Sequence, residues 1–211
     1  MIKESLPKMN IMLIHGQSRT LLSMGLLGWR LSRQGYNVRY FGYFAFLQTF
    51  EDITRRFVQK VRDEINPEPY AIVGHSLGAI IARASLPQLK DNPPRHLIML
   101  APPNQPPMIA KKVRRNPVYR WLTQDCGRRL ADDAFYEKLP RPTVPTTIIA
   151  GGRGWPKLIS PFGDAINDGI LAAAETELGE GYQVILARAT HPLIMNSKDV
   201  ARLITELAAV E

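Results

Sequence analysis

The sequence of 211 residues predicts an α/β fold, in which a parallel β-sheet is flanked by helices. Short apolar runs alternate along the chain with longer amphipathic stretches. Most of these runs are continuous rather than alternating, which is typical of strands covered on both faces. Apolar residues make up 45% of the chain and charged residues 22%. These fractions exclude disordered, collagen-like and coiled-coil proteins.

Six apolar runs are the expected strands, and the second alternates more than the others, which suits an edge of the sheet. They cover residues 10–14, 37–41, 70–73, 96–100, 146–150 and 183–187.

Between the strands, apolar residues recur at steps of three and four, which indicates helices. The clearest helical pattern covers residues 50–65 and ends before Pro67, which cannot continue a helix. Similar patterns run from Leu77 to near Pro87 and over residues 200–207.

The connection between the fourth and fifth strands is unusually long. It covers about residues 102–145, is rich in proline at both ends and has a helical pattern in its middle. Connections of this length usually have a function or form a subdomain. We expect a helical cap over the carboxyl ends of the strands, inserted into a single domain that spans residues 1–211.

The third strand leads directly into Gly74-His75-Ser76-Leu77-Gly78, and a helix follows. This is the G-x-S-x-G pattern of a nucleophile elbow. A serine at the tip of such a turn has a strained backbone, and glycines on either side avoid clashes where the chain passes close by. The start of the helix offers N–H groups to a developing negative charge. We therefore predict that Ser76 is a nucleophile.

A serine hydroxyl needs a base, and the chain has four histidines. His75 lies inside the elbow and cannot fold back on its neighbour. His15 opens the turn after the first strand, and His96 begins a strand at the opposite edge from Ser76. His191 follows the sixth strand and emerges at the same edge as Ser76, so we predict that it is the base.

The imidazole in turn needs a carboxylate, which should follow the fifth strand. Asp164 and Asp168 are the candidates. We favour Asp168, because Asn167-Asp168-Gly169 is a turn that would present its side chain and then open a helix over residues 170–176. The order serine, aspartate, histidine is the one expected after this type of elbow.

An oxyanion hole needs two backbone N–H groups. Leu77, which follows the nucleophile, would give one. The other should come from the turn after the first strand, where Gly16 lets the chain approach the elbow, and we assign it to Gln17.

With these pieces in place, the chain resembles α/β-hydrolases of the bacterial lipase and esterase type. The matching segments follow one another in the family's order over nearly the whole chain. They are LIHGQSRT, RLSRQGYNVRYFGY, IVGHSLGAIIAR, MLAPPN, NDGIL and ATHPLIM. Close members of the family carry an apolar residue and a glycine where this chain has Gln17 and Ser18.

The resemblance implies a minimal six-stranded sheet, all parallel, in the order 2-1-3-4-5-6. It also implies a helical cap and no metal or organic cofactor. Carried over residue by residue, it assigns the nucleophile to Ser76, the acid to Asp168, the base to His191 and the oxyanion donors to Gln17 and Leu77.

The expected function is that of a serine carboxylester hydrolase, which cleaves hydrophobic acyl esters through an acyl-enzyme on Ser76. Two alternatives stay open. One is a thioesterase or acyltransferase with the same triad, and the other is a non-catalytic lipid-binding protein that retains the fold.

The chain has 27 basic and 19 acidic residues, and much of its net charge of +8 lies in the expected cap. Seven basic residues fall within residues 111–129, against the single acid Asp125. The rest is nearly neutral, which argues against a nucleic-acid partner. Three interpretations of the cap remain: a solvated surface that covers the site, docking to anionic lipid, or recognition of an anionic substrate headgroup.

Residues 1–10 contain no apolar region of the signal-peptide type, and no run approaches 18 apolar residues. We therefore expect a cytoplasmic protein. The single cysteine, Cys126, excludes an internal disulfide, and no cysteine–histidine cluster has zinc-ligand spacing. We expect no catalytic role for the Cys126 thiol.

Overall fold

Six parallel strands form one sheet in the computed structural model of the chain, which describes residues 8–209. The order β2-β1-β3-β4-β5-β6 is the one expected, and residues 1–7 and 210–211 of the expected domain lie outside the described residues. The strands are β1 (Lys8–Ile14), β2 (Tyr36–Phe41), β3 (Tyr70–His75), β4 (His96–Leu100), β5 (Thr146–Gly151) and β6 (Gln183–Ala187).

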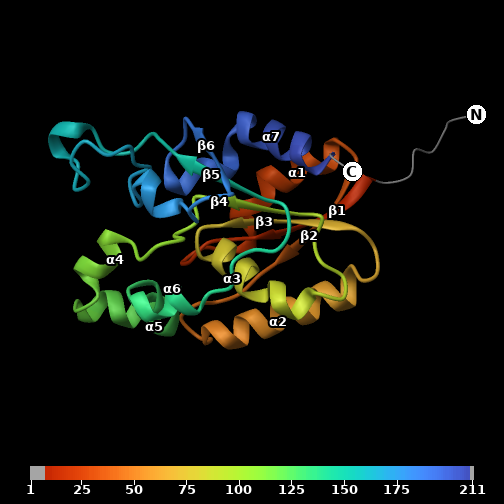
Figure 1. Cartoon of the computed structure of the whole chain (residues 1–211), viewed down its shortest axis with the longest axis horizontal. Coiled ribbons are helices and arrows are strands. Elements are labelled where there is room, and N and C mark those ends of the chain that lie inside the picture. The colour runs from red at the N-terminus through yellow and green to blue at the C-terminus, as the bar shows by residue number, and fades with distance from the viewer. Residues whose placement is uncertain (1–7, 210–211) are drawn as a thin grey trace, which may run out of the picture.

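Two pairs of helices cover the two faces of the sheet (Figure 1). Helix α2 follows the predicted apolar pattern: it begins after Thr49, whose side chain accepts a hydrogen bond from the Asp52 N–H, and it buries Phe50, Ile53 and Phe57. One face carries α1 (Gly25–Arg33) and α7 (Lys198–Ala208), and the other α2 (Phe50–Glu64) and α3 (Leu77–Ser85).

The burial of the strands follows their place in the sheet. The central strand β3 is buried along its whole length, as its continuous apolar run predicts. Strand β2 lies at one edge, also as predicted. Strand β6 differs from the expectation, because Val184 and Leu186 are exposed although the run is apolar. The reason is that β6 is the other edge strand and pairs with β5 alone.

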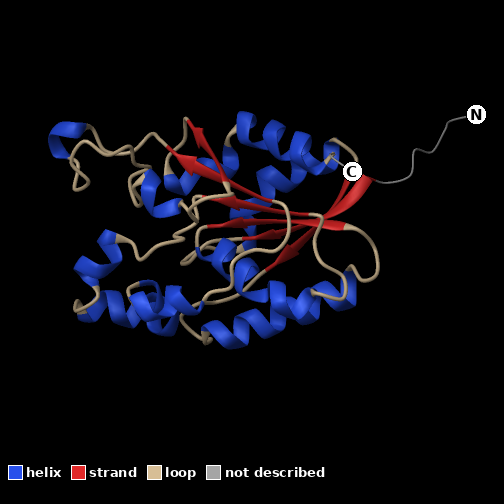
Figure 2. Cartoon of the chain, viewed as in Figure 1, coloured by secondary structure: helices blue, strands red, loops and turns tan. Residues whose placement is uncertain are grey.

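The long connection after β4 is helical, and it lies beside α2 at the end of the molecule where the strands finish (Figures 1 and 2). Asp125 accepts a hydrogen bond from the Phe50 N–H at 2.9 Å, and the rings of Phe50 and Phe135 meet edge to face at 5.0 Å. Cys126 is buried here, and burial raises the pKa of its thiol to about 12. The connection forms α4 (Met108–Val113), α5 (Pro117–Leu130) and α6 (Asp133–Lys138).

The prediction of a helix over residues 170–176 is wrong. Only its second half is helical, as a 3₁₀ turn, because residues 166–173 form a tight turn instead: the Ala173 N–H donates to the carbonyl oxygen of Ile166 at 2.8 Å, and the Asp168 N–H donates to that of Leu171 at 3.0 Å. The other short 3₁₀ helices are η1 (Leu21–Met24), η2 (Leu86–Leu89), η3 (Lys157–Ile159) and η5 (His191–Asn196), and the 3₁₀ turn above is η4 (Ala173–Thr176). Within residues 8–209, no helix combines the length and the apolar character needed to cross a membrane.

Candidate active site

Ser76 is the single residue between the end of β3 and the start of α3, and it has φ 52° and ψ −122°. This is a conformation that non-glycine residues rarely adopt and that is often found at functional sites. A Cβ on Gly74 would lie 2.6 Å from the Cα of Ala79, and one on Gly78 would lie 2.4 Å from the carbonyl oxygen of His15. The two glycines are therefore required by the close approach of the backbone, as the sequence predicts.

The sixth strand delivers His191 to the same edge of the sheet. Its Nε2 lies 3.0 Å from Ser76 Oγ, and its Nδ1 lies 2.7 Å from Asp168 Oδ2. The backbone N–H of His191 also donates to the carbonyl oxygen of Asp168 at 2.8 Å. Because a carboxylate accepts, Nδ1 carries the proton when the ring is neutral, and Nε2 is then free to accept the Ser76 hydroxyl proton.

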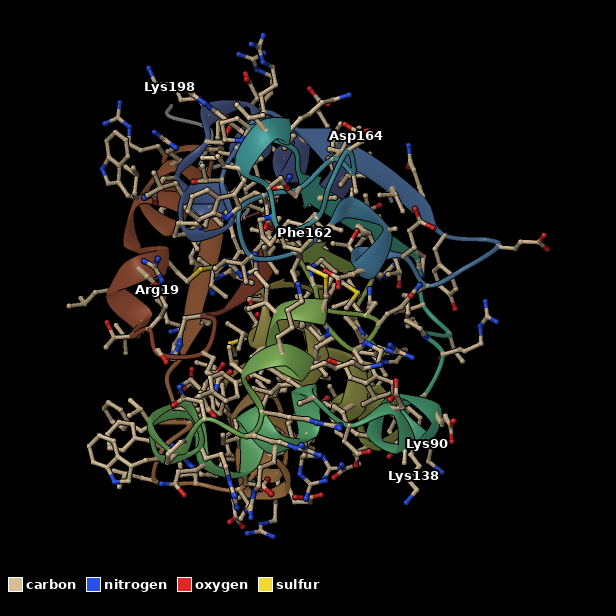
Figure 3. All side chains as sticks on the ribbon, turned by 90° about the vertical axis from the view of Figure 1, so that its left-hand side faces the viewer. Arg19, Lys90, Lys138, Phe162, Asp164 and Lys198 are labelled. Atoms are coloured by element: carbon tan, nitrogen blue, oxygen red, sulfur yellow. The ribbon has the colours of Figure 1, made fainter. Side chains whose placement is uncertain are left out.

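Asp168 is held by more than the histidine. Its side chain is almost fully buried, and Oδ1 accepts hydrogen bonds from the N–H groups of Ile170 (2.9 Å) and Leu171 (2.7 Å). The alternative, Asp164, has a side chain 87% exposed that pairs with Lys157 at 3.3 Å. Figure 3 shows Asp164 in the upper part of the view. The structure thus brings Asp168 to His191 and leaves Asp164 apart.

The loop after β1 packs against the elbow. A Cβ on Gly16 would lie 2.8 Å from His75 Nδ1 and 3.1 Å from the Cβ of Ser76. His15 fixes this loop, because its Nδ1 donates to the Gly16 carbonyl at 2.8 Å and its Nε2 accepts from the Tyr43 N–H at 3.2 Å. Burial lowers the pKa of His15, which favours this neutral form. Ser18 has φ 55°, a conformation that glycine adopts more readily than serine does.

The two backbone groups predicted to stabilise an oxyanion lie on either side of this contact. Gln17 follows Gly16 in the loop, and Leu77 is the first residue of α3. Neither N–H donates a hydrogen bond to an acceptor within the described part of the chain. Unpaired N–H groups of this kind, one of them at a helix N-terminus, are suited to a negatively charged oxygen.

Helix α5 of the insert meets the same loop. It is kinked at Gln124, which has φ 47° and ψ −133°, and next to the kink the Thr123 carbonyl accepts a hydrogen bond from the Gln17 side chain at 3.5 Å. The insert therefore reaches the loop that carries one of the two predicted N–H groups.

Sequence reasoning considered His75 only as a base and missed its contact. Its side chain is buried, and Nε2 lies 3.0 Å from the carbonyl oxygen of His191. No local signal could have revealed this contact, because the two residues are 116 positions apart in the sequence and meet only when β3 and β6 end at the same side of the sheet.

A cavity of about 630 Å³ opens beside the loop after β1. Ser76 does not line it, but His15 does, and the adjacent Gly16 packs against Ser76. Most of its walls are apolar and come from the β2–α2 connection and α5, namely Phe44, Ala45, Phe46, Leu47 and Trp121. The space suits a hydrocarbon group.

A second hollow, of about 390 Å³, lies on the insert. Four arginines line it together with Asp132, whose carboxylate caps α6. Among the described residues, only Arg128 of the four has a carboxylate partner, Asp125 at 3.8 Å. Four of the basic residues of the insert thus line one groove, namely Arg114, Arg115, Arg120 and Arg128.

Within residues 8–209, no group of three or more histidine, cysteine, aspartate or glutamate side chains is placed to hold a metal ion.

Comparison with solved structures finds lipases, esterases and thioesterases of the same fold. The mature lipase BlEst2 of Bacillus licheniformis superposes with a TM-score of 0.76 at 15% identity, over 98% of this chain and 94% of the lipase. A metagenomic carboxyl esterase gives 0.71 at 15% identity, over 97% and 75% of the two chains. The thioesterase domain of NocB, from a nocardicin cluster, gives 0.63 at 14% identity, over 98% and 96%.

At this level of identity the superpositions show the fold. No curated protein sequence matches the chain significantly. A family model does, however, and it is that of the alpha/beta hydrolase family, matched over residues 11–209. The chain therefore belongs to the alpha/beta hydrolase family.

Proposed function

We propose that this protein is a serine hydrolase that cleaves carboxylic esters with a hydrophobic acyl group. The observation that carries the proposal is the continuous hydrogen-bonded series from Ser76 Oγ through His191 to Asp168, with distances of 3.0 and 2.7 Å. The strained backbone of Ser76 supports it, because this is the conformation that exposes a nucleophile at the top of the sheet.

In the proposed reaction, His191 Nε2 takes the hydroxyl proton of Ser76 while Oγ attacks the ester carbonyl carbon. The carbonyl oxygen becomes negative and accepts hydrogen bonds from the N–H groups of Gln17 and Leu77. The imidazolium, stabilised by Asp168, then gives its proton to the departing alcohol oxygen, and the acyl group stays on Ser76. Water repeats the sequence on the acyl-enzyme and releases the acid.

The apolar cavity beside the oxyanion loop supports a hydrophobic substrate. Its volume of about 630 Å³ is that of a site for a medium-sized organic molecule. Phe46, Leu47 and Trp121 line it and are more than half exposed. Covering them with a hydrocarbon chain removes apolar area from water, which favours binding.

A thioesterase or acyltransferase is the second candidate. The same attack and the same proton transfers serve a thioester, and the likeness of fold to the NocB thioesterase domain is compatible with this activity. The third possibility, a non-catalytic lipid-binding protein, is less well supported, because it gives no reason for a strained serine hydrogen-bonded to a histidine.

The test is the hydrolysis of p-nitrophenyl esters from acetate to palmitate by the wild type and by Ser76→Ala. We expect the variant to lose about 10⁴-fold in kcat. Ser32→Ala, a change of the same kind at an exposed position of α1, is the matched control and should keep full activity. Acyl thioesters and added alcohols, assayed in parallel, separate the ester, thioester and transfer activities. Equal rates for the wild type and Ser76→Ala on all substrates would refute the proposal.

We also propose that the face around the site contacts anionic lipid. Val118 and Trp121 of α5 are exposed by 63% and 71%, and three arginines of the neighbouring groove lack carboxylate partners among the described residues. Apolar side chains next to cations are the composition of a peripheral membrane contact.

A further inference from the structure

Arg19 lies two residues after Gln17, in the loop that packs against the elbow. Its side chain is half-buried and lines the apolar cavity. Within residues 8–209 it forms no ion pair and donates no side-chain hydrogen bond. Its charge reaches the site, because it contributes to the lowered pKa of His75, the residue before Ser76.

Within residues 8–209, no carboxylate forms an ion pair with this cation. Two acids of the neighbouring insert have basic partners of their own, since Asp125 binds Arg129 at 2.8 Å and Asp133 binds Lys111 at 2.6 Å. Figure 3, which looks toward the edge where the strands end, shows Arg19 well separated from Asp164.

A guanidinium beside apolar walls loses part of its hydration, and a paired anion offsets that cost. An anion cannot come from the apolar residues that line the cavity, which are Phe44, Phe46, Leu47 and Trp121. A bound ligand can supply the anion. Arginine is also the side chain whose planar fork matches a carboxylate or a phosphate with two parallel hydrogen bonds.

We propose that Arg19 makes the site selective for amphiphilic substrates that carry a carboxylate or a phosphate, with the apolar chain in the cavity and the anion paired to Arg19. This inference rests on the proposed function for the reaction but not for the binding. It differs from the arginine groove of the insert, because Arg19 belongs to the loop that carries Gln17.

The first test measures binding and needs no turnover. Octyl phosphate, octanoate, 1-octanol and inorganic phosphate are titrated by calorimetry into the wild type, Arg19→Gln, Arg19→Lys and Arg95→Gln. Arg95 lies directly before β4, at the amino ends of the strands and therefore at the other end of the sheet from Ser76. Arg95→Gln makes the same change in net charge as Arg19→Gln. The two octyl anions separate phosphate from carboxylate, and inorganic phosphate tests whether the chain is needed.

We expect at least one octyl anion to bind the wild type about 10- to 100-fold more tightly than 1-octanol, which is the range for a hydrogen-bonded charge. Arg19→Gln should lose this preference, Arg19→Lys should keep part of it, and Arg95→Gln should keep it all. Three results would overturn the proposal: no binding of any octyl ligand, equal affinity for octanol and the anions, or the same loss in Arg95→Gln as in Arg19→Gln.

The second test uses two esters of equal chain length, p-nitrophenyl octanoate and the p-nitrophenyl monoester of suberic acid. The wild type should prefer the charged ester in kcat/KM, and Arg19→Gln should reduce that preference about tenfold or more. If the wild type binds octyl anions through Arg19 but hydrolyses neither ester, the proposed function fails and the anion site stands. If both esters are hydrolysed without a preference for the charged one, the proposed function stands and the role of Arg19 in substrate selection fails.

Discussion

His75 donates a hydrogen bond from Nε2 to the carbonyl oxygen of His191 at 3.0 Å. A carbonyl only accepts, so Nε2 carries the proton, and the neutral ring leaves Nδ1 unprotonated. Nδ1 is buried and has no partner within residues 8–209. His75 thus holds the backbone of His191, whose side chain contacts Ser76 Oγ, and His75 is neutral when it does so.

This neutrality predicts a loss of stability in weak acid. Burial lowers the pKa of His75 well below 6.5 and lowers that of His15 as well. At pH values between the pKa values of the folded state and about 6.5, the unfolded chain binds more protons than the folded chain does. The stability that the neutral histidines contribute is therefore fully present above about pH 6.5 and falls as the pH decreases. Each histidine can cost at most about 1.4 kcal/mol per pH unit in this window.

Urea unfolding at pH 7.5, 6.5 and 5.5 measures this dependence. His75→Gln cannot titrate in the window, so its free energy of unfolding should fall less steeply than that of the wild type. Identical pH dependences for the two proteins would show that His75 is not held neutral.

The two candidate aspartates give a matched pair. Asp168→Asn keeps the shape of the side chain but removes the charge that orients and stabilises the His191 ring, so kcat should fall by about 10⁴-fold. Asp164→Asn changes an exposed side chain paired with Lys157 and should leave kcat unchanged. Both are measured with p-nitrophenyl esters at pH 7.5. Comparable losses in the two variants would exclude the assignment of Asp168.

The backbone of Ser76 predicts a trade between activity and stability. At φ 52° a side chain is strained, at a cost of about 1–3 kcal/mol, and glycine relieves that strain. Ser76→Gly should therefore be more stable than Ser76→Ala by about 1 kcal/mol, although both are inactive. Thermal unfolding of the two variants measures the difference. A less stable glycine variant would argue against a strained elbow.

The proposed contact with anionic lipid predicts binding to vesicles that contain phosphatidylglycerol but not to vesicles of phosphatidylcholine alone. Replacing Arg114, Arg115 and Arg120 together by glutamine should reduce sedimentation with the anionic vesicles, and added salt should do the same. Arg95→Gln is the control for charge away from this face. Equal binding to both vesicle types would reject the contact.

The sequence predicted the features that depend on one strand or one turn. The elbow at Ser76 and the emergence of His191 beside it follow from where parallel strands end, whereas the sheet order was expected from the resemblance to α/β-hydrolases. The helix expected after Asp168 was wrong, because the Ala173 N–H donates to the carbonyl oxygen of Ile166, which lies before the predicted helix, and a turn forms instead. Local periodicity does not report a competing acceptor of this kind.

Two other features depend on contacts between distant segments. The cavity forms where the β2–α2 connection meets α5, and neither segment alone carries a signal for it. The kink at Gln124 could not be predicted either, since a glutamine gives no local reason for φ 47°. In both cases tertiary packing decides the structure.

The most direct test of the central claim is covalent labelling. An alkyl fluorophosphonate reacts with a serine only when a neighbouring base activates its oxygen. Mass spectrometry of the labelled native protein should show a single adduct on Ser76, and Ser76→Ala should show none. A native protein that stays unlabelled, or that carries the adduct on another residue, would contradict the account.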